Sequence, residues 1–335
     1  MTARKQIQYY GKKLLVLLLS VLALSLLVFY LARLAPGDPL VAYYGDRTEK
    51  MSVEERERSL ERLGLDDPIY LQYVHWVEQA FQGNFGISYQ YKQPVLDVLE
   101  GRVGNTLLLG GVGFLLTFLL ALFLGVFCAW QENRWPDQLL CKIGTLTSCI
   151  PEFWLCLVLI LLFSVTLRWF PSSGAYAVGQ ADNVWSRIQH LILPMAVLVL
   201  SHLWYYAYFI RNQILEEIRA DYVLLAKAKG LSQGTILVRH CLRNTLPTYL
   251  NLMAISVPHI LGGTYIIEMV FSYPGIGTLS YESARCHDYN LLMVVCMLTG
   301  IIVIVCSLLV QILNERIDPR IRGQRRIEGE EVTTL

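Results

Sequence analysis

Three long runs without a charged residue constrain the fold of this chain more than any other feature. They cover residues 14–32, 103–131 and 289–313 of a 335-residue chain. A helix needs about 20 consecutive apolar residues to cross the hydrocarbon core of a bilayer, and each run is close to this length or longer. Hydrophobic residues make up 54% of the chain and charged residues only 16%, which is too apolar for an ordinary soluble protein. The sequence therefore predicts an all-α integral membrane protein.

Three further apolar runs each contain an ionisable residue or a proline. They cover residues 143–167, 191–210 and 248–271, which gives six predicted transmembrane helices. The first run of the chain follows a basic amino terminus, as a signal peptide would, but no small-residue cleavage site follows it. We therefore expect it to remain as the first helix. A five-span chain with a cleaved first segment is the alternative.

Basic residues near the ends of the runs predict the orientation in the membrane. Cytosolic loops carry an excess of Lys and Arg, whereas long segments translocate largely regardless of charge. With both termini in the cytosol, the basic residues of the short loops lie inside and the long, acid-rich segment between helices one and two lies outside. The predicted parts are 1–34, the basic amino-terminal segment and first helix; 35–102, the extracytoplasmic segment; and 103–335, the core with helices two to six, a cytosolic loop at 211–247 and a cytosolic tail.

The longest polar interruption in the second half of the chain is the stretch 221–247, here called the knob. Good helix formers run up to Gly230, where a glycine can take the left-handed conformation that ends a helix. Ser232 can cap a second helix over 235–246, and Pro247 then ends it. The sequence predicts two short helices joined at a glycine, with basic residues around them: Lys227, Lys229, Arg239 and Arg243.

The knob resembles the loop through which permease subunits of ABC importers dock into their ATPase subunits. The short motif of that loop is Glu-Ala-Ala, three residues and Gly. Gly230 fits, Ala226 keeps the last alanine, and Leu224 and Leu225 stand at the first two positions. The pattern Asp-Tyr-Val-x-x-Ala-Lys-Ala-Lys-Gly-Leu, with a later His-x-x-Arg-Asn-x-x-Pro, resembles the dipeptide, oligopeptide and nickel permease subfamily, and within it the first permease subunit.

The resemblance covers nearly the whole chain. After the knob, its strongest match is the stretch 267–277 at the outer end of the fifth predicted span. The other matching stretches are 34–39, 63–68, 83–88, Asp288-Tyr289 and Asp318-Pro319-Arg320. The chain departs from the family at Cys286-His287, which replace the usual polar or basic pair and leave the local chemistry of the outer gate open.

The resemblance implies the type I ABC importer permease fold and a role as one transmembrane subunit. It further implies a heterodimer with a homologous second permease, two ABC ATPase subunits that bind ATP and magnesium, and an extracytoplasmic solute-binding protein. The location would be a bacterial or archaeal cell membrane. The solute would be a dipeptide, an oligopeptide, nickel or a metal chelate, and the sequence leaves this choice open. An ion-coupled secondary transporter without ATPase partners is the alternative function.

Two sets of site residues follow from the resemblance. Coupling to the ATPase is expected from Ala226, Lys229, Gly230, His240, Arg243 and Asn244. For the lysines alone, snorkelling to the membrane interface is an equally good explanation. An outer gate is expected at Glu268, Pro274 and Gly275, although Glu268 also fits a structural role beside the turn that follows it.

A third set of residues follows from depth in the bilayer. Glu152 lies nine residues into the run that starts at residue 143, or roughly 13 Å at 1.5 Å per residue. His202 and His259 lie near the middle of the fourth and fifth spans. Ionisable residues at such depth usually face an interior or a water-filled cavity. We expect these three side chains to line a translocation path. Interhelical hydrogen bonding that only holds the bundle together is the alternative.

The sequence lacks the motifs that ATP binding, metal binding and catalysis usually require. The chain has no Gly-x-x-x-x-Gly-Lys loop for ATP, no metal-type spacing among its eight cysteines and no clustered catalytic set. Cys286, His287 and Asp288 carry metal-binding atoms, but three adjacent residues do not form a chelate by themselves. A net charge of +1 gives no reason to expect nucleic acid. We therefore expect no cofactor, metal or catalytic residue in this chain, and membrane lipid around it.

Overall fold

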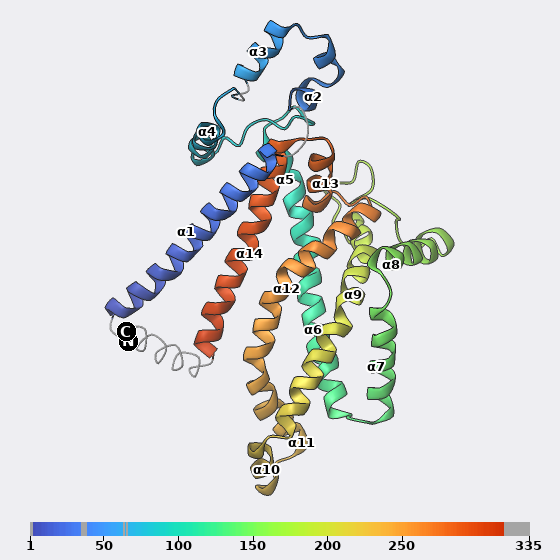
Figure 1. The fold of residues 1–335 in the computed structure, drawn as a ribbon. Helices are drawn as coiled ribbons and strands as arrows, with labels where there is room; N and C mark the ends of the chain where they lie inside the picture. Colours follow the sequence, from blue (N-terminus) through green and yellow to red (C-terminus); the bar gives the residue numbers. More distant parts are fainter. Residues whose placement is uncertain (1–2, 35–38, 63, 65, 318–335) are drawn as a thin grey trace. The chain divides into compact units, whose positions relative to one another are not determined.

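The computed structural model describes residues 3–34, 39–62, 64 and 66–317 (Figure 1). Within these residues every regular element is a helix, and Ile87 and Pro94 form an isolated bridge. The family match at 318–320, most of the match at 34–39, and two positions of the match at 63–68 lie outside the described residues.

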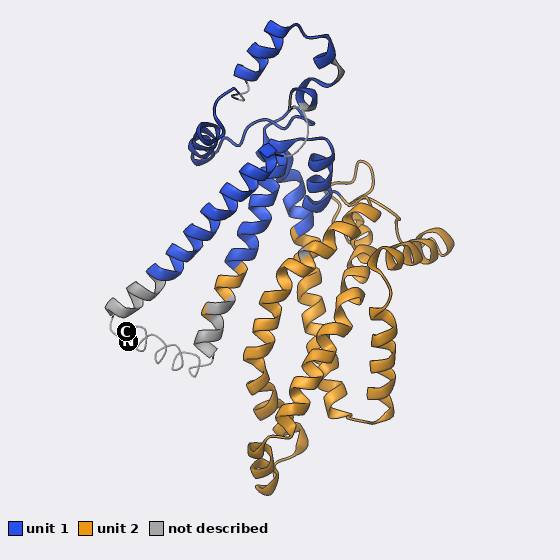
Figure 2. Ribbon diagram, viewed as in Figure 1, with its two compact units in different colours: residues 1–106, 274–305 blue, residues 107–273, 306–335 orange. Residues whose placement is uncertain are grey.

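The chain packs into two compact units, coloured separately in Figure 2. Unit 1 contains Met1–Thr106 and Pro274–Val305, and unit 2 contains Leu107–Tyr273 and Cys306–Leu335. The sequence suggested dividing the chain at residues 34 and 102. That division separates parts by their expected position relative to the membrane, and it stays a prediction. Packing groups the segments differently, because residues far apart in the chain share each core.

In unit 1, an aromatic cluster joins the first apolar helix to the outer segment. Helix α1 (Ala3–Leu34) packs on α4 (Ile69–Phe81), where the rings of Phe29 and Tyr73 have centroids 5.3 Å apart. The hydroxyls of Ser25 and Tyr73 share a hydrogen bond of 2.8 Å. This contact explains why an apolar span and an amphipathic helix stay together.

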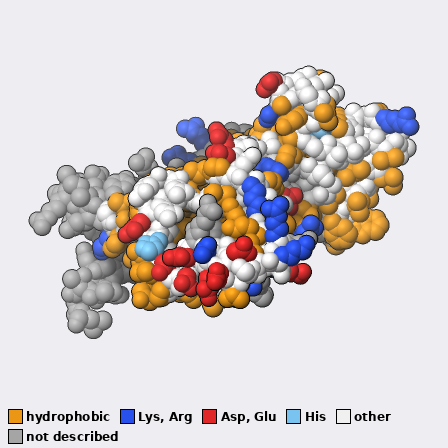
Figure 3. Space-filling model, turned by 90° about the horizontal axis from the view of Figure 1, so that it is seen from above, with side chains coloured by type: hydrophobic (Ala, Val, Ile, Leu, Met, Phe, Trp, Pro, Cys, Tyr) orange, Lys and Arg blue, Asp and Glu red, His pale blue; other side chains and the backbone are white. Residues whose placement is uncertain are grey.

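Most described residues of the outer segment that precede α4 are also helical. It contains α2 (Pro39–Tyr44), the 3-10 turn η1 (Gly45–Lys50) and α3 (Val53–Arg62). Helices α3 and α4 fall within two amphipathic stretches of this segment, 53–63 and 68–81. Residues 54–58 of α3 are all exposed. Figure 3 shows acidic and basic side chains interspersed with hydrophobic ones over this view of the molecule.

A second core of unit 1 combines α5 (Val95–Thr106), α13 (Ile276–Arg285) and the beginning of α14 (Tyr289–Ile317). The stretch 272–288 between the fifth and sixth predicted spans therefore contains a helix. Asp288 is fully buried and accepts hydrogen bonds from the Ser88 hydroxyl and from the backbone N–H groups of Gln90 and Leu291. It therefore caps α14 and fixes the loop before α5 to it.

Unit 2 is organised around α9 (Val184–Ile218). The helix packs against α6 (Val112–Trp130), α7 (Trp135–Ser148) and α12 (Leu242–Val270). Two glycines allow close approach. A Cβ on Gly125 of α6 would lie 2.8 Å from the Ala207 carbonyl oxygen, and a Cβ on Gly144 of α7 would lie 2.7 Å from the Trp204 ring. Small residues are the usual solution for tight helix contacts inside a membrane.

Four described helices are long and apolar enough to cross a membrane. The spans are Gly11–Leu34, Val95–Trp130, Val184–Ile218 and Tyr289–Leu309, and two bent helix pairs raise the number to six if each pair is one span. The second span begins earlier than expected, since α5 and the π-helical turn η2 (Leu107–Gly111) precede α6. The exact number of spans and their orientation stay predictions.

The third span differs most from the expectation. The helix α7 ends at Ser148, and α8 (Glu152–Leu159) with the π-helical turn η3 (Ile160–Thr166) leaves at an angle of 100°. Pro151 has no N–H to continue the hydrogen bonding of α7, and its backbone is extended, with ψ of 142°. The depth of Glu152 therefore does not follow from counting along one straight helix, as the sequence argument assumed.

Candidate functional site

A cavity of about 900 Å³ lies in unit 2 between α7, α9, the start of α8 and α12. Apolar and aromatic side chains form much of its wall, including Trp204, Tyr205, Tyr206 and Tyr208 of α9. Glu152, His202 and His259 all lie in this wall. The structure thus brings together the three ionisable residues that the sequence placed at a common depth.

The three side chains lie close to one another. Oε1 of Glu152 is 3.6 Å from Nδ1 of His202, and the rings of His202 and His259 have centroids 5.8 Å apart. The Nδ1 of His202 also lies 3.0 Å from the Leu198 carbonyl oxygen, one turn earlier in α9. Gly263 of α12 leaves room for the pair, since a Cβ there would lie 3.0 Å from His202 and 3.2 Å from Glu152.

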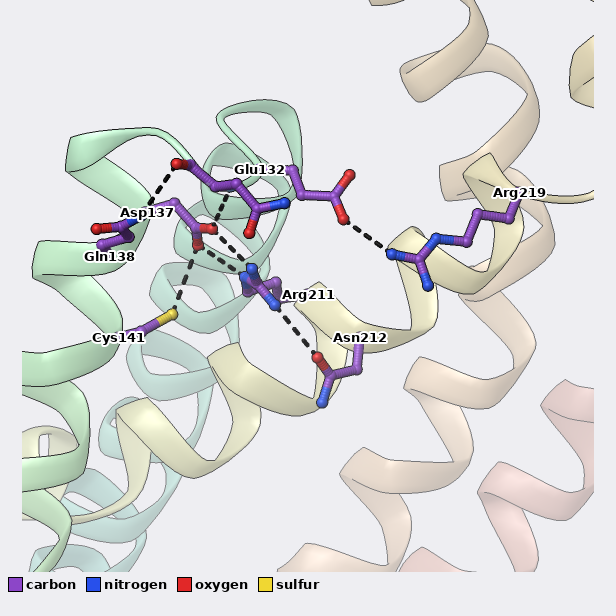
Figure 4. A network of polar contacts seen from close by, with 8 residues as sticks. Glu132, Asp137, Gln138, Cys141, Arg211, Asn212 and Arg219 are labelled. Carbon is purple, nitrogen blue, oxygen red and sulfur yellow. Dashed lines mark hydrogen bonds and ion pairs between the residues drawn. The ribbon is translucent and has the colours of Figure 1, made fainter.

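A buried ion pair also reaches this cavity, and the sequence analysis missed it (Figure 4). Arg211 of α9 donates from Nε and Nη2 to the two carboxylate oxygens of Asp137 in α7, each at 2.7 Å. The Asp137 side chain is only 2% exposed and also accepts a bond from the backbone N–H of Asn133. The sequence signal was an acid and a base at neighbouring ends of the third and fourth apolar runs.

The knob consists of α10 (Asp221–Ala228), the short helix α11 (Gln233–Thr235), the π-helical turn η4 (Ile236–Cys241) and the beginning of α12. Gly230 has a φ of +76°, which confirms the left-handed turn. The Ser232 hydroxyl accepts a hydrogen bond from the Thr235 N–H, which confirms the cap. Pro247 does not end a helix, because α12 continues through it to Val270.

The residues expected to contact an ATPase fall into two groups. Lys229, Gly230 and Arg243 are exposed and His240 is partly exposed. Ala226 is only 5% exposed and packs in the core of unit 2, so it supports the knob from inside. Its part in coupling stays a prediction.

Asn244 connects the knob to α9. Its Nδ2 donates to Oε2 of Glu217 at 3.2 Å, and the hydroxyl of Tyr222 donates to the same oxygen. Burial and this carboxylate raise the pKa of Tyr222, so its phenol stays protonated and remains a donor at neutral pH. Glu217 therefore joins the end of α9 to α10 and to the beginning of α12.

The exposed surface of the knob is apolar as well as basic. Leu224 is 72% exposed, Leu225 58% and Val238 61%, beside the exposed Lys227 and Lys229. Leu224 and Leu225 stand at the two positions where the family motif has Glu and Ala. Exposed large apolar side chains on a protruding loop are typical of a surface that another protein covers.

The residues of the expected outer gate lie in different units. Glu268 is fully buried in α12 of unit 2. In unit 1, the Pro274 carbonyl accepts a bond of 2.8 Å from Asn105, and Gly275 forms the cap of α13 with Thr278. These contacts assign Pro274 and Gly275 a clear structural role, whereas a gating role stays a prediction.

The described residues contain no cluster of three or more His, Cys, Asp or Glu side chains arranged to hold a metal ion. In the stretch 286–288, Asp288 is directed to Ser88 and to backbone N–H groups. Glu152, His202 and His259 are close, but Nδ1 of His202 already has the Leu198 carbonyl as its partner.

Two protein families match the chain. Residues 121–323 match the family described as "Binding-protein-dependent transport system inner membrane component". Residues 7–110 match the family described as "Binding-prot-dependent transport system membrane comp, N-term". The two matches together cover most of the sequence.

Similar proteins carry peptide-transport names. The chain is 34% identical over 301 residues to the oligopeptide transport system permease protein AppB of Bacillus subtilis (strain 168), covering 90% of this chain and 94% of that protein. It is 33% identical over 317 residues to a putative peptide permease protein of Brucella ovis, covering 94% and 99%. Among solved structures, a chain of the MetNI methionine ABC transporter in an inward-facing conformation has a TM-score of 0.54 at 18% identity, covering 67% of this chain and 97% of that chain. The latter likeness shows the fold alone.

Proposed function

Because the chain belongs to the family of binding-protein-dependent transport system inner membrane components, we propose that it is a transmembrane subunit of an ATP-driven importer for peptides. It pairs with a second permease of the same family, with two ATPase subunits in the cytosol and with an extracytoplasmic solute-binding protein. The location is the inner membrane of a bacterium. Peptides are preferred over nickel because the similar proteins carry peptide-transport names.

The knob is the observation that carries this proposal. It is built as a rigid body, since its buried residues Val223, Ala226 and Ile236 belong to the core of unit 2. The Glu217 carboxylate connects α10 and the beginning of α12 to the end of α9. A movement imposed on the knob is therefore transmitted to α9 and α12, which form walls of the cavity.

The partner surface of the knob is formed by Leu224 and Leu225, with Lys229 and Arg243 at its rim. A buried apolar anchor surrounded by charge is the usual composition of a protein interface. ATP binding closes the ATPase dimer, the knob follows, and the pathway opens outward. Hydrolysis resets it. Such coupling requires that the two nucleotide states make different contacts with the knob.

Replacing Leu225 by Asp tests this assignment. A charge in the centre of the contact should reduce co-purification of the ATPase subunits with the permease at least about tenfold, equivalent to about 1.4 kcal/mol or more. The matched control is Val53→Asp, since Val53 is 75% exposed and lies in the outer segment. Retention of the ATPase subunits by Leu225→Asp at the level of Val53→Asp would refute the contact.

A further inference from the structure

We propose that the cavity of unit 2 is a cation-selective binding site, in which Glu152 receives a positively charged N–H donor such as the ammonium group of a peptide. This inference deepens the proposed transport function, on which its physiological meaning rests. The test below measures the cavity itself and does not require transport.

Glu152 is a carboxylate without a hydrogen-bond donor in the described part of the chain. The nearest basic atom is Nδ1 of His202 at 3.6 Å, which is too long for a hydrogen bond. Its side chain is 20% exposed and lies in the cavity wall. A carboxylate in such an apolar setting requires a positive partner or water. The cavity is where that partner can bind.

The histidine beside Glu152 does not supply the missing donor. A carbonyl oxygen only accepts hydrogen bonds, so Nδ1 of His202 must donate its hydrogen to Leu198 at 3.0 Å. In the neutral ring, Nε2 is then an acceptor. His259 faces His202 edge-on, with the rings at 85°. Nε2 of His202 therefore adds an acceptor to the site.

Three hydroxyl groups in the cavity wall are likewise available only as acceptors, because their hydrogens are already donated. Ser148 donates to the Gly144 carbonyl at 2.8 Å, Ser201 donates to Val197 at 2.9 Å, and Thr145 donates to Cys141 at 2.9 Å. Each hydroxyl donates its hydrogen to a carbonyl in the preceding turn of its own helix, and its oxygen keeps lone pairs that can accept a hydrogen bond. These oxygens favour a ligand that brings its own N–H groups.

Apart from Glu152 and the two histidines, the only ionisable Lys, Arg, Asp or Glu side chain in the described wall is Arg211, and the Asp137 carboxylate neutralises it through two bonds of 2.7 Å. Arg211 lies nine residues beyond His202 in α9, or roughly 14 Å along the helix. Glu152 also stands in the first turn of α8, where the helix dipole stabilises a negative charge. The aromatic wall adds rings on which a cation can bind.

Cys149 provides a probe inside this cavity. It is an exposed free thiol in the wall, three residues before Glu152. In the assembled transporter, its rate of modification by a methanethiosulfonate carrying a trimethylammonium group is compared with that for one carrying a sulfonate group. Mass spectrometry of the peptides reads each cysteine separately, and the rate ratio is normalised to that of a free thiol.

The wild-type chain should favour the cationic reagent at Cys149 by about fivefold or more, because the Glu152 carboxylate lies in the same cavity wall and contributes to the local potential. Glu152→Gln should remove most of this preference, and Glu152→Asp should keep it. The control Glu132→Gln removes a charge that pairs with Arg219 outside the cavity wall and should change nothing. Equal rates for both reagents in the wild type, or a preference that survives Glu152→Gln, would overturn the proposal.

Protection of Cys149 by peptides identifies the group that binds. Trialanine with a free amino terminus should slow modification at least about twofold at millimolar concentration, whereas N-acetyl-trialanine should not. Equal protection by both, or protection by neither, contradicts recognition of an ammonium group. If Leu225→Asp loses the ATPase subunits and Cys149 keeps its preference for the cationic reagent, the ATPase contact and the cation site are both supported independently. If the ATPase contact is normal and Cys149 shows no such preference, only the cation site is refuted.

Discussion

At the scale of single residues, charge burial distinguishes two ion pairs that look alike in the sequence. Asp137 and Arg211 are 2% and 15% exposed and join through two parallel hydrogen bonds. Glu132 and Arg219 are 32% and 72% exposed and join through one contact of 3.0 Å. Figure 4 shows both pairs, of which the first connects α7 to α9.

Removal of one partner should therefore have very different costs. Asp137→Ala leaves the Arg211 guanidinium partly buried without its partner, and we expect about 3–5 kcal/mol of destabilisation. Glu132→Ala should cost about 0–1 kcal/mol, because exposed pairs contribute little. Thermal unfolding of the purified protein in detergent measures both. Similar costs for the two variants would contradict the assignment.

At this scale, the sequence indicated which residues are important better than it indicated which residues contact each other. Glu152, His202 and His259 were grouped from depth alone, and the structure places them around one cavity. The break at Pro151, with its 100° bend, invalidated the straight-helix arithmetic for Glu152. Ala226 matched the motif and is nevertheless buried, because a motif does not state which face of α10 packs inward. The Asp137–Arg211 pair depends on how α7 packs against α9, which no local pattern contains.

At the scale of elements, α9 is the helix on which unit 2 is built, and glycines set its distance to its neighbours. Apolar runs predicted the existence of the long helices. Their lengths were less predictable, since α9 and α12 extend beyond the apolar residues into polar sequence. Prolines were poor markers of helix ends, because Pro194, Pro247 and Pro258 all lie inside helices.

Gly125→Ala should weaken the contact between α6 and α9. The added Cβ would lie 2.8 Å from both the Ala207 carbonyl oxygen and Ile210, and neither can move without shifting α9. We expect a destabilisation of about 1–3 kcal/mol, the usual cost of overpacking. Gly111→Ala is the control, since a Cβ at that position meets nothing within 4 Å. Thermal unfolding decides: a Gly125→Ala protein as stable as the Gly111→Ala protein would rule out close packing here.

At the scale of the whole molecule, the proposed function depends on which side of the membrane each exposed region faces. Residues 54–58 of α3 are exposed and highly charged, and the knob is exposed and basic. The proposed function requires these two regions on opposite sides of the membrane. The family assignment was predictable because the resemblance extends over most of the chain, whereas the topology rests on the distribution of basic residues.

Cysteines introduced at Glu57 and at Lys229 test that topology, since both positions are exposed. A membrane-impermeant thiol reagent applied to spheroplasts should label Glu57→Cys at once and Lys229→Cys only after lysis. Peptide mass spectrometry separates these sites from the native cysteines. Labelling in the reverse order would invert the orientation and exclude the knob from any cytosolic ATPase.

The most direct test of the central claim is the ratio of solute transported to ATP hydrolysed in the reconstituted transporter carrying Gly230→Val. Gly230 has a φ of +76° and nothing within 4 Å of a Cβ, so the substitution strains the backbone turn of the knob without a side-chain clash. Gly234→Val is the control, because Gly234 has the same open space without a positive φ. If the knob couples nucleotide state to the pathway, Gly230→Val should assemble and hydrolyse ATP but transport at least about tenfold less solute per ATP, while Gly234→Val stays near wild type. An unchanged ratio in an assembled Gly230→Val transporter would contradict the claim.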